Sequence, residues 1–254
     1  STPWHPLLAC ALFIVPGVPL INFVDDMLDN YIQVGIVRAV NTLLMVAAMA
    51  FGIAFAVKLC HIDNFFPTIS MVPHHKYWEY AIAAAISAMG FSMIFNIQRR
   101  LLWVVAIGGI IAVCTRNFVN LGPSTNNIGL DMGLVIGSFS GSVLVSLIAI
   151  KAVHWFHVPN HVLTIPSVIP MIPGVLMYRM LFGLINMNVQ SIDQVTPLMK
   201  AIESGVNSGL VIMCIALGVA IPNIFGRRFI AASKNKRLAA ILKERRARGK
   251  FVEW

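Results

Sequence analysis

Two short stretches of sequence, IPMIPGV at residues 169–175 and IVPGVP at residues 14–19, decide the fold. Each places two prolines beside a glycine inside a long apolar block. Proline removes a backbone hydrogen bond and clashes with the preceding turn, so each block predicts a helix that is broken part-way along its length. Unwound backbone at membrane depth is tolerated only where it is buried in protein or lines a watery cavity. The two stretches therefore predict a pair of broken helices inside a membrane-embedded bundle.

Around these breaks, the composition excludes an ordinary soluble domain. The chain is 58% hydrophobic and only 11% charged, against the roughly 25% charged residues of typical soluble domains. Its apolar blocks of about 17 to 28 residues are long enough to cross a hydrocarbon layer of ~30 Å. These features predict an all-α integral membrane protein with about seven transmembrane helices, over residues 6–22, 32–60, 77–95, 101–118, 130–157, 162–185 and 199–226.

The two broken blocks are each followed by a polar loop and a long helix, which indicates an internal repeat. The copies are an odd number of spans apart and would face opposite ways, as in the inverted repeats of secondary transporters. We expect residues 1–60 to end a first repeat, 61–76 to connect, 77–226 to form a second five-helix repeat, and 227–254 to form a basic tail. A five-span repeat would place three helices before residue 1, so a preceding segment or a partner subunit is expected.

Charge predicts the orientation of the bundle. The net charge is +9, and the last 28 residues hold ten Lys or Arg against two Glu. Directly after a membrane span, such a tail is typical of a cytoplasmic C-terminus held near anionic lipid headgroups rather than of a nucleic-acid site. This orientation puts the acidic loop expected at residues 25–29 on the inside, where Asp26 could accept a proton, attract an ammonium group or remain a solvated loop charge.

Charged residues inside the spans are costly and need a partner, a cavity or a position near the interface. Arg38 and Asn41 lie about two turns into the second span, and Glu203 and Asn207 share one face of the seventh. A guanidinium, a carboxylate and carboxamides together suit the two charges of an amino acid. The alternative is a structural ion pair that joins the two long helices.

The breaks themselves are candidate binding elements. Half-helix ends at Pro16, Gly17, Pro170, Pro173 and Gly174 would offer N–H groups to a carboxylate or carbonyls to a cation. The alternative is a pair of packing kinks. Arg116, at the end of the fourth span, could reach the outer headgroups or line the path.

Other patterns favour structural roles. His154, His157 and His161, and the neighbouring His74 and His75, lack the Cys or Asp ligands that would complete a metal site, so no metal or cofactor is expected. The four cysteines have no metal-binding or redox spacing. Small residues at 133–142 favour close helix packing. No nucleophile motif, phosphate loop or catalytic dyad is present, so we expect no enzyme.

The order of these motifs resembles that of the bacterial threonine/serine exporter family. The resemblance rests on two sets of residues: residues 15–19 with Asn22, Asp26, Gly35 and Arg38, and then Phe95-Asn96, Arg99 or Arg100, residues 169–174, Tyr178, Leu217-Gly218 and Ile221-Pro222. It covers almost all of residues 7–226. It implies a bacterial inner-membrane exporter of about ten helices, in one chain or two partner subunits, of which this chain begins near the fourth helix.

The resemblance also implies export of threonine and serine driven by the proton gradient, whereas related members are associated with dicarboxylate export. The alternative from another class is a membrane scaffold subunit without transport activity, in which the breaks would pack dry against their neighbours. The candidate substrate-binding residues are Pro16, Gly17, Asn22, Asp26, Arg38, Asn41, Pro170, Pro173, Gly174, Tyr178, Glu203 and Asn207.

Overall fold

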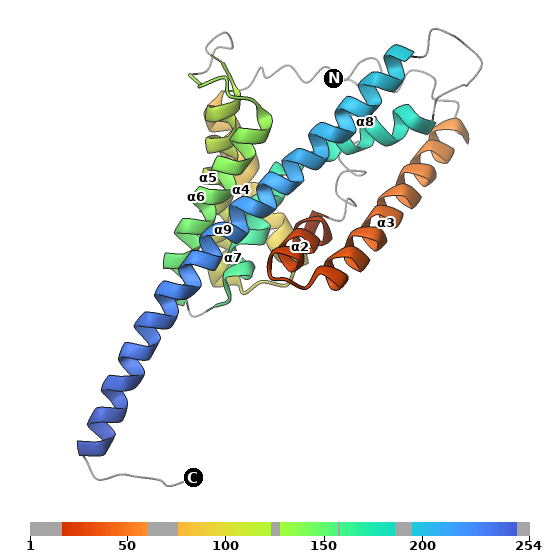
Figure 1. Ribbon diagram of the computed structural model, residues 1–254. Helices are drawn as coiled ribbons and strands as arrows, with labels where there is room; N and C mark the ends of the chain where they lie inside the picture. Colours follow the sequence, from red (N-terminus) through yellow and green to blue (C-terminus); the bar gives the residue numbers. More distant parts are fainter. Residues whose placement is uncertain (1–16, 60–75, 123–127, 157, 186–194, 248–254) are drawn as a thin grey trace.

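The computed structural model describes residues 17–59, 76–122, 128–156, 158–185 and 195–247 (Figure 1). Every element within these residues is helical. In chain order they are α2 (Gly17–Leu28), α3 (Ile32–Leu59), α4 (Tyr77–Ile94), the 3-10 turn η1 (Arg99–Leu101), α5 (Leu102–Asn120), α6 (Leu134–Phe156), α7 (Asn160–Val168), the 3-10 turn η2 (Ile169–Met171), α8 (Gly174–Ile185) and α9 (Val195–Ala247).

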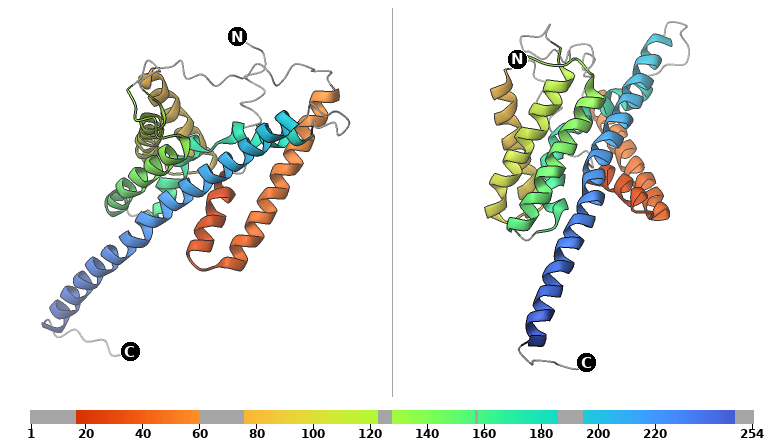
Figure 2. Two further views of the ribbon diagram at one scale, coloured as in Figure 1. Left: turned by 45° about the horizontal axis from the view of Figure 1, so that its top comes forward. Right: turned by 60° about the vertical axis from the view of Figure 1, so that its left-hand side comes forward.

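The helices form two groups on either side of α9. Helices α4, α5 and α6 lie side by side with α7 against them, and α2 with α3 lies on the other side of the molecule (Figures 1 and 2). Helix α9 packs against α6, α8 and α2, so it joins the groups. At 53 residues, α9 is about 80 Å long and extends well beyond the bundle at its C-terminal end (Figure 1).

Small residues let these helices approach closely, as membrane helices do. On α5, a Cβ at Gly109 would lie 2.7 Å from the Ala88 side chain of α4. On α6, a Cβ at Gly141 would lie 2.6 Å from the Ala112 carbonyl oxygen of α5. The Ser142 hydroxyl of α6 occupies the space above Gly218 of α9. The predicted packing role of the small-residue stripe on the fifth span is confirmed by these contacts.

Buried hydroxyl groups on α6 are satisfied within the protein. Ser138 donates to the Leu134 carbonyl at 2.8 Å and Ser142 donates to the Ser138 carbonyl at 2.9 Å. Ser146 instead crosses to α9 and donates to the Val219 carbonyl at 2.9 Å. Since hydrocarbon offers no hydrogen-bond partner, this pairing allows polar residues inside an apolar bundle.

Four helical stretches are long and apolar enough to cross a membrane: Ile32–Met49, Arg99–Asn120, Leu134–Val153 and Leu198–Gly226. Large apolar side chains on their outer surfaces are exposed, such as Leu43, Leu44 and Trp103, each at least 63% accessible. An exposed apolar surface of this extent marks contact with lipid in a chain of this composition. The chain is therefore a membrane protein, but the predicted count of seven spans is not confirmed.

One predicted boundary is wrong, and two predictions agree with the structure. Asp25 and Asp26 were predicted in a loop but belong to the last turns of α2. The span predicted at 162–185 is broken, as its prolines predict, into α7, η2 and α8, because Pro170 and Pro173 stop the helix between Val168 and Gly174. The span predicted at 199–226 matches the apolar stretch Leu198–Gly226. Its helix, α9, continues through the basic stretch to Ala247, since that stretch contains no proline or helix-ending turn signal.

Candidate functional site

The second Pro-Gly stretch forms a true break between two helices. Ile172 has extended backbone (φ −62°, ψ 129°), and α8 begins afresh at Gly174. The N–H of Ile172 donates to the Ile169 carbonyl at 3.0 Å, and that of Gly174 donates to the Ile172 carbonyl at 2.9 Å. These short-range bonds replace the ordinary helical ladder, so the chain changes direction inside the bundle.

Arg116 of α5 points to this break. Its Nη1 donates to the Met171 carbonyl at 3.3 Å, and its Nε and Nη2 both lie 3.4 Å from Oδ1 of Asn117. Met171 is only 1% exposed. A guanidinium carries five N–H donors, so Nη1 and Nη2 each keep a second hydrogen that no bond to a described residue uses. The arrangement brings a cation to the unwound backbone, which favours the path-lining role of Arg116 over the snorkelling one.

Gly17 of the first Pro-Gly stretch contacts the second break. Gly17 is the first described residue of α2, and Gly174 begins α8. Gly17 is buried, and a Cβ built on it would collide with the Ile172 side chain. Two segments more than 150 residues apart in sequence therefore touch, and α2 and α8 run in different directions (Figure 1). The contact is apolar and closely packed, because Ile172 covers Gly17.

An ion pair lies near the C-terminal end of α2. Asp26 Oδ2 lies 2.6 Å from Nη1 of Arg38, which reaches back from α3 across a tight turn. Asn30 has positive φ (69°) in that turn, and the Tyr31 N–H donates to the Asp26 carbonyl at 2.8 Å. The Arg38 and Asp26 side chains are partly exposed, at 39% and 24%, whereas Oδ2 of Asp26, the oxygen in the pair, is itself buried.

The same end of α2 approaches α7. His161 Nε2 lies 4.0 Å from Asp25 Oδ2, and this contact is an ion pair only when the imidazole is protonated. Next to His161, the Asn160 amide donates to Oδ1 of Asn223 on α9. Ser146 of α6 lies 3.4 Å from that oxygen. Side chains from α6, α7 and α9 thus meet in one polar cluster of Asn160, Asn223 and Ser146.

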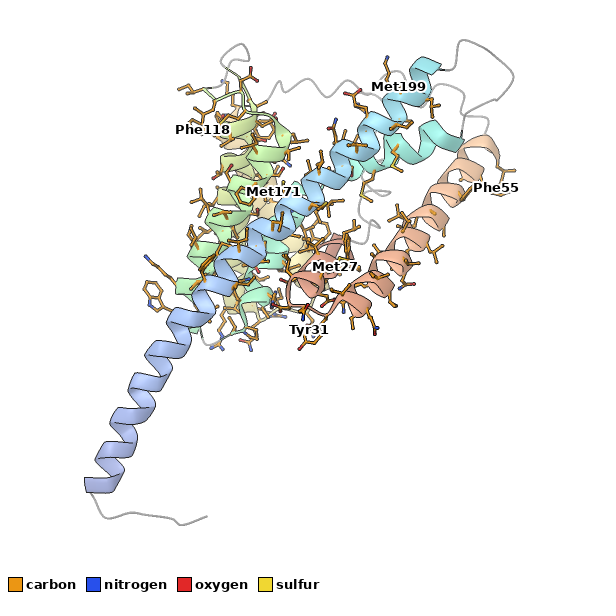
Figure 3. All side chains as sticks on the ribbon, in the orientation of Figure 1. Met27, Tyr31, Phe55, Phe118, Met171 and Met199 are labelled. Carbon is orange, nitrogen blue, oxygen red and sulfur yellow. The ribbon has the colours of Figure 1, made fainter. Side chains whose placement is uncertain are left out.

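The structure separates two predicted anchors, Arg38 and Glu203. Figure 3 labels Tyr31 at the start of α3 and Met199 near the start of α9, at opposite ends of the helical bundle from which the C-terminal part of α9 extends. Arg38 follows Tyr31 by two turns and Glu203 follows Met199 by one. The alternative of an ion pair between the two long helices is wrong, because Arg38 pairs with Asp26.

The remaining predicted site residues divide by location. Pro170 lies in η2, Pro173 directly precedes α8, and Gly174 begins α8. The residue of this stretch that contacts Gly17 is Ile172. Asn22 and Asn207 are half-buried, and Asn41 and Glu203 are exposed. Pro16 and the side chain of Tyr178 lie outside the described residues, as do His74, His75, His157 and the side chain of His154. No three possible metal ligands gather among the residues that the structure describes.

The sequence did not predict the polar cluster, and it left two roles open for Arg116, contact with the outer headgroups and lining of the path. Asn160 and Asn223 each follow a proline, Pro159 and Pro222, and a polar residue beside a helix-breaking proline is the signal that could have found them. The partner of Arg116 is a backbone carbonyl 55 residues away in sequence. Such a pairing leaves no local pattern in the sequence.

Two family models match the chain. One, described as "Threonine/Serine exporter, ThrE", matches residues 80–225, which is more than half of the chain. A second threonine/serine exporter model matches residues 2–60. The chain belongs to the threonine/serine exporter family. The first match covers α4 to the apolar part of α9 of this exporter, including Arg116 and the second break, and the second match covers α2 and α3.

The family identity confirms the resemblance read from the two Pro-Gly stretches. It makes this exporter a transport protein with a small-molecule substrate in a membrane setting. No solved structure matches the chain.

Proposed function

We propose that the chain forms the translocation path of a proton-coupled exporter of threonine and serine in the bacterial inner membrane, with the substrate held where the two broken helices meet. The contact between Gly17 and Ile172, with Arg116 beside it at the Met171 carbonyl, is the observation that carries the proposal. The start of α8, unwound backbone and a cation converge beside Gly17. This combination supplies partners for a small zwitterion inside an apolar bundle.

The substrate carboxylate is assigned to Arg116 and the first turn of α8. Arginine binds carboxylates through two parallel N–H bonds, and the second hydrogens of Nη1 and Nη2 suit that geometry. The N-terminus of α8 adds a partial positive charge. The substrate ammonium is assigned to the second lone pairs of the backbone carbonyls of residues 169–173, since each carbonyl oxygen can accept two hydrogen bonds.

Opening of the site requires Ile172 to leave Gly17. Ile172 closes the contact through the end of its side chain, so a change of rotamer or a small tilt of α8 would make room. The short helix of each pair packs against the long helix of the other, because α2 contacts α9 and α8 contacts α3. This exchange supports treating α2–α3 and α8–α9 as the inverted units that open the site alternately to the two sides of the membrane.

The coupling proton is assigned to Asp26. Its carboxylate pairs with Arg38 and its side chain is partly exposed, so protonation would release Arg38 and loosen the turn between α2 and α3. Release at this end of α2 would be transmitted along one short helix to Gly17. The C-terminal end of α9, with its Lys and Arg residues, is assigned to the cytoplasmic side.

Transport by sealed vesicles containing the exporter, with an imposed pH gradient, tests the proposal. Labelled threonine is expected to move only with the gradient, and unlabelled serine is expected to compete. Movement of labelled succinate without threonine would contradict the amino acid assignment and favour a dicarboxylate exporter. If the folded protein moves neither compound, the dry contact of the breaks belongs to a scaffold subunit.

A further inference from the structure

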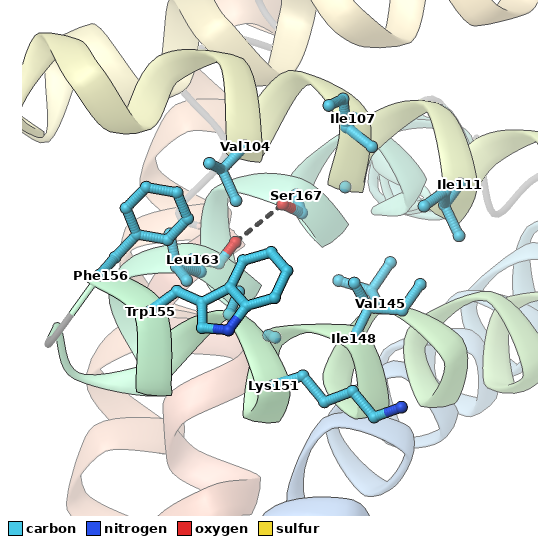
Figure 4. A pocket seen from close by; sticks show the side chains of 13 residues that line it. Val104, Ile107, Ile111, Val145, Ile148, Lys151, Trp155, Phe156, Leu163 and Ser167 are labelled. Carbon is cyan, nitrogen blue, oxygen red and sulfur yellow. Dashed lines mark hydrogen bonds between the residues drawn. The ribbon is translucent and has the colours of Figure 1, made fainter.

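An apolar groove lies on the outer face of α5, α6 and α7, away from the contact of the breaks (Figure 4). Its volume is about 450 Å³, within the range of about 300–1,000 Å³ seen for ligand sites. Its walls are aliphatic or aromatic apart from Lys151 and Ser167, with Ile107, Ile111 and Val145 on the two long sides.

The polar group on the groove floor is already satisfied. Ser167 donates to the Leu163 carbonyl at 2.7 Å and also lies 3.3 Å from the Val105 carbonyl. Ile107 and Ile148 are 56% and 46% exposed, so the groove opens to the lipid-facing surface. An occupant of the groove must therefore be apolar along its length.

The mouth of the groove is cationic and aromatic. Lys151 is exposed and its amine lies at the end of an extended side chain at the groove edge (Figure 4), and Trp155 is 84% exposed one turn further along α6. Tryptophan and lysine at this depth are typical of the membrane interface. The basic stretch of α9 begins nearby, because a Cβ at Gly226 would lie 2.8 Å from Ile150, the neighbour of Lys151.

We propose that this groove binds one anionic phospholipid, with an acyl chain between α5 and α6 and the headgroup phosphate on Lys151. The choice of an anionic lipid follows from charge, since Lys151 and the residues after Gly226 give this end of the bundle a positive field, and the described residues that line the groove include no acidic side chain. A Cβ at Gly108 would collide with the Ser167 side chain, so α5 and α7 pack tightly at the groove floor. The acyl chain would lie along α7, just before the second break.

The test is competition for photolabelling of the full protein in vesicles. The probe is a phosphatidylglycerol with a diazirine in mid-chain, and labelled peptides are mapped by mass spectrometry. We expect saturable labelling of α5 and α6 residues that line the groove. Unlabelled phosphatidylglycerol should compete at about fivefold lower concentration than phosphatidylcholine, the effect of one lysine at an anionic surface.

Variants separate the headgroup from the chain. Lys151→Ala should abolish the difference between the two competitors, whereas Lys76→Ala, an exposed lysine outside the groove, should preserve it. Ala152→Phe fills the groove and should remove the labelling. The proposal is overturned if both lipids compete equally in the wild-type protein or if the groove residues are not labelled. It is also overturned if a second copy of the protein, or residues 1–16, is found cross-linked in the groove. All of these outcomes are measured on the wild-type protein, so none depends on the folding of a variant.

Discussion

Replacement of Arg116 perturbs the proposed substrate site at its cation. Arg116→Ala removes the bond from Nη1 to the Met171 carbonyl and the two N–H groups assigned to the substrate. A hydrogen bond to a charged group contributes about 1.5–3 kcal/mol, so half-maximal export should require about 10- to 150-fold more threonine. Arg116→Lys keeps the charge without the two-pronged geometry and should fall between the wild-type and alanine proteins.

The assay is threonine transport into vesicles, paired with thermal unfolding in detergent to show that each variant is folded. Threonine methyl ester, which lacks the carboxylate, should compete poorly with the wild type, and Arg116→Ala should discriminate little between ester and acid. Arg100→Ala, which removes an exposed arginine bonded to Gln98, is the matched control. A folded Arg116→Ala protein with wild-type threonine dependence would refute the reasoning.

Three further changes follow from the geometry. Asp26→Asn removes the carboxylate paired with Arg38, so threonine movement should lose its dependence on the pH gradient. The free energy of unfolding should change by less than about 1 kcal/mol, because partly exposed ion pairs contribute little. Retained gradient dependence would remove Asp26 from the coupling. Gly141→Ala puts a Cβ 2.6 Å from a backbone oxygen and should cost about 1–3 kcal/mol of unfolding free energy; Gly209→Ala, which meets nothing within 4 Å, is the control and should cost nothing. Asn223→Ala leaves the buried Asn160 amide without its partner and should lower the unfolding free energy by about 1–3 kcal/mol, whereas an unchanged melting temperature would show that the polar cluster contributes no stability.

The breaks were predictable from sequence because their cause is local. Pro170, Pro173 and Gly174 stop one helix and start another whatever surrounds them, and the long helix at residues 32–60 matches α3 to within one residue. The extension of α9 beyond the predicted span has a different cause. Hydropathy reports where lipid contact ends, near Gly226, and a helix of Lys, Arg and Ala residues can continue past that point.

The candidate site was less predictable because its contacts join distant segments. Nothing near Arg38 in sequence distinguishes Asp26 from Glu203 as its partner, and the choice depends on the tight turn at Asn30. The inward direction of Arg116 depends on the packing of α5 against η2. Sequence therefore identified the elements of the site, and only the fold shows that Gly17 and Ile172 are in contact.

The contact of the two breaks is the centre of the account, and the accessibility of residue 172 tests it most directly. Ile172→Cys is introduced into a variant without Cys10, Cys60, Cys114 and Cys214, and its reaction with a small polar maleimide is followed in vesicles during transport. We predict that the thiol reacts, that saturating threonine slows the reaction, and that Arg116→Ala removes this protection. A thiol that stays unreactive in a transporting protein, or that reacts at the same rate with and without threonine, would contradict a substrate site between the broken helices.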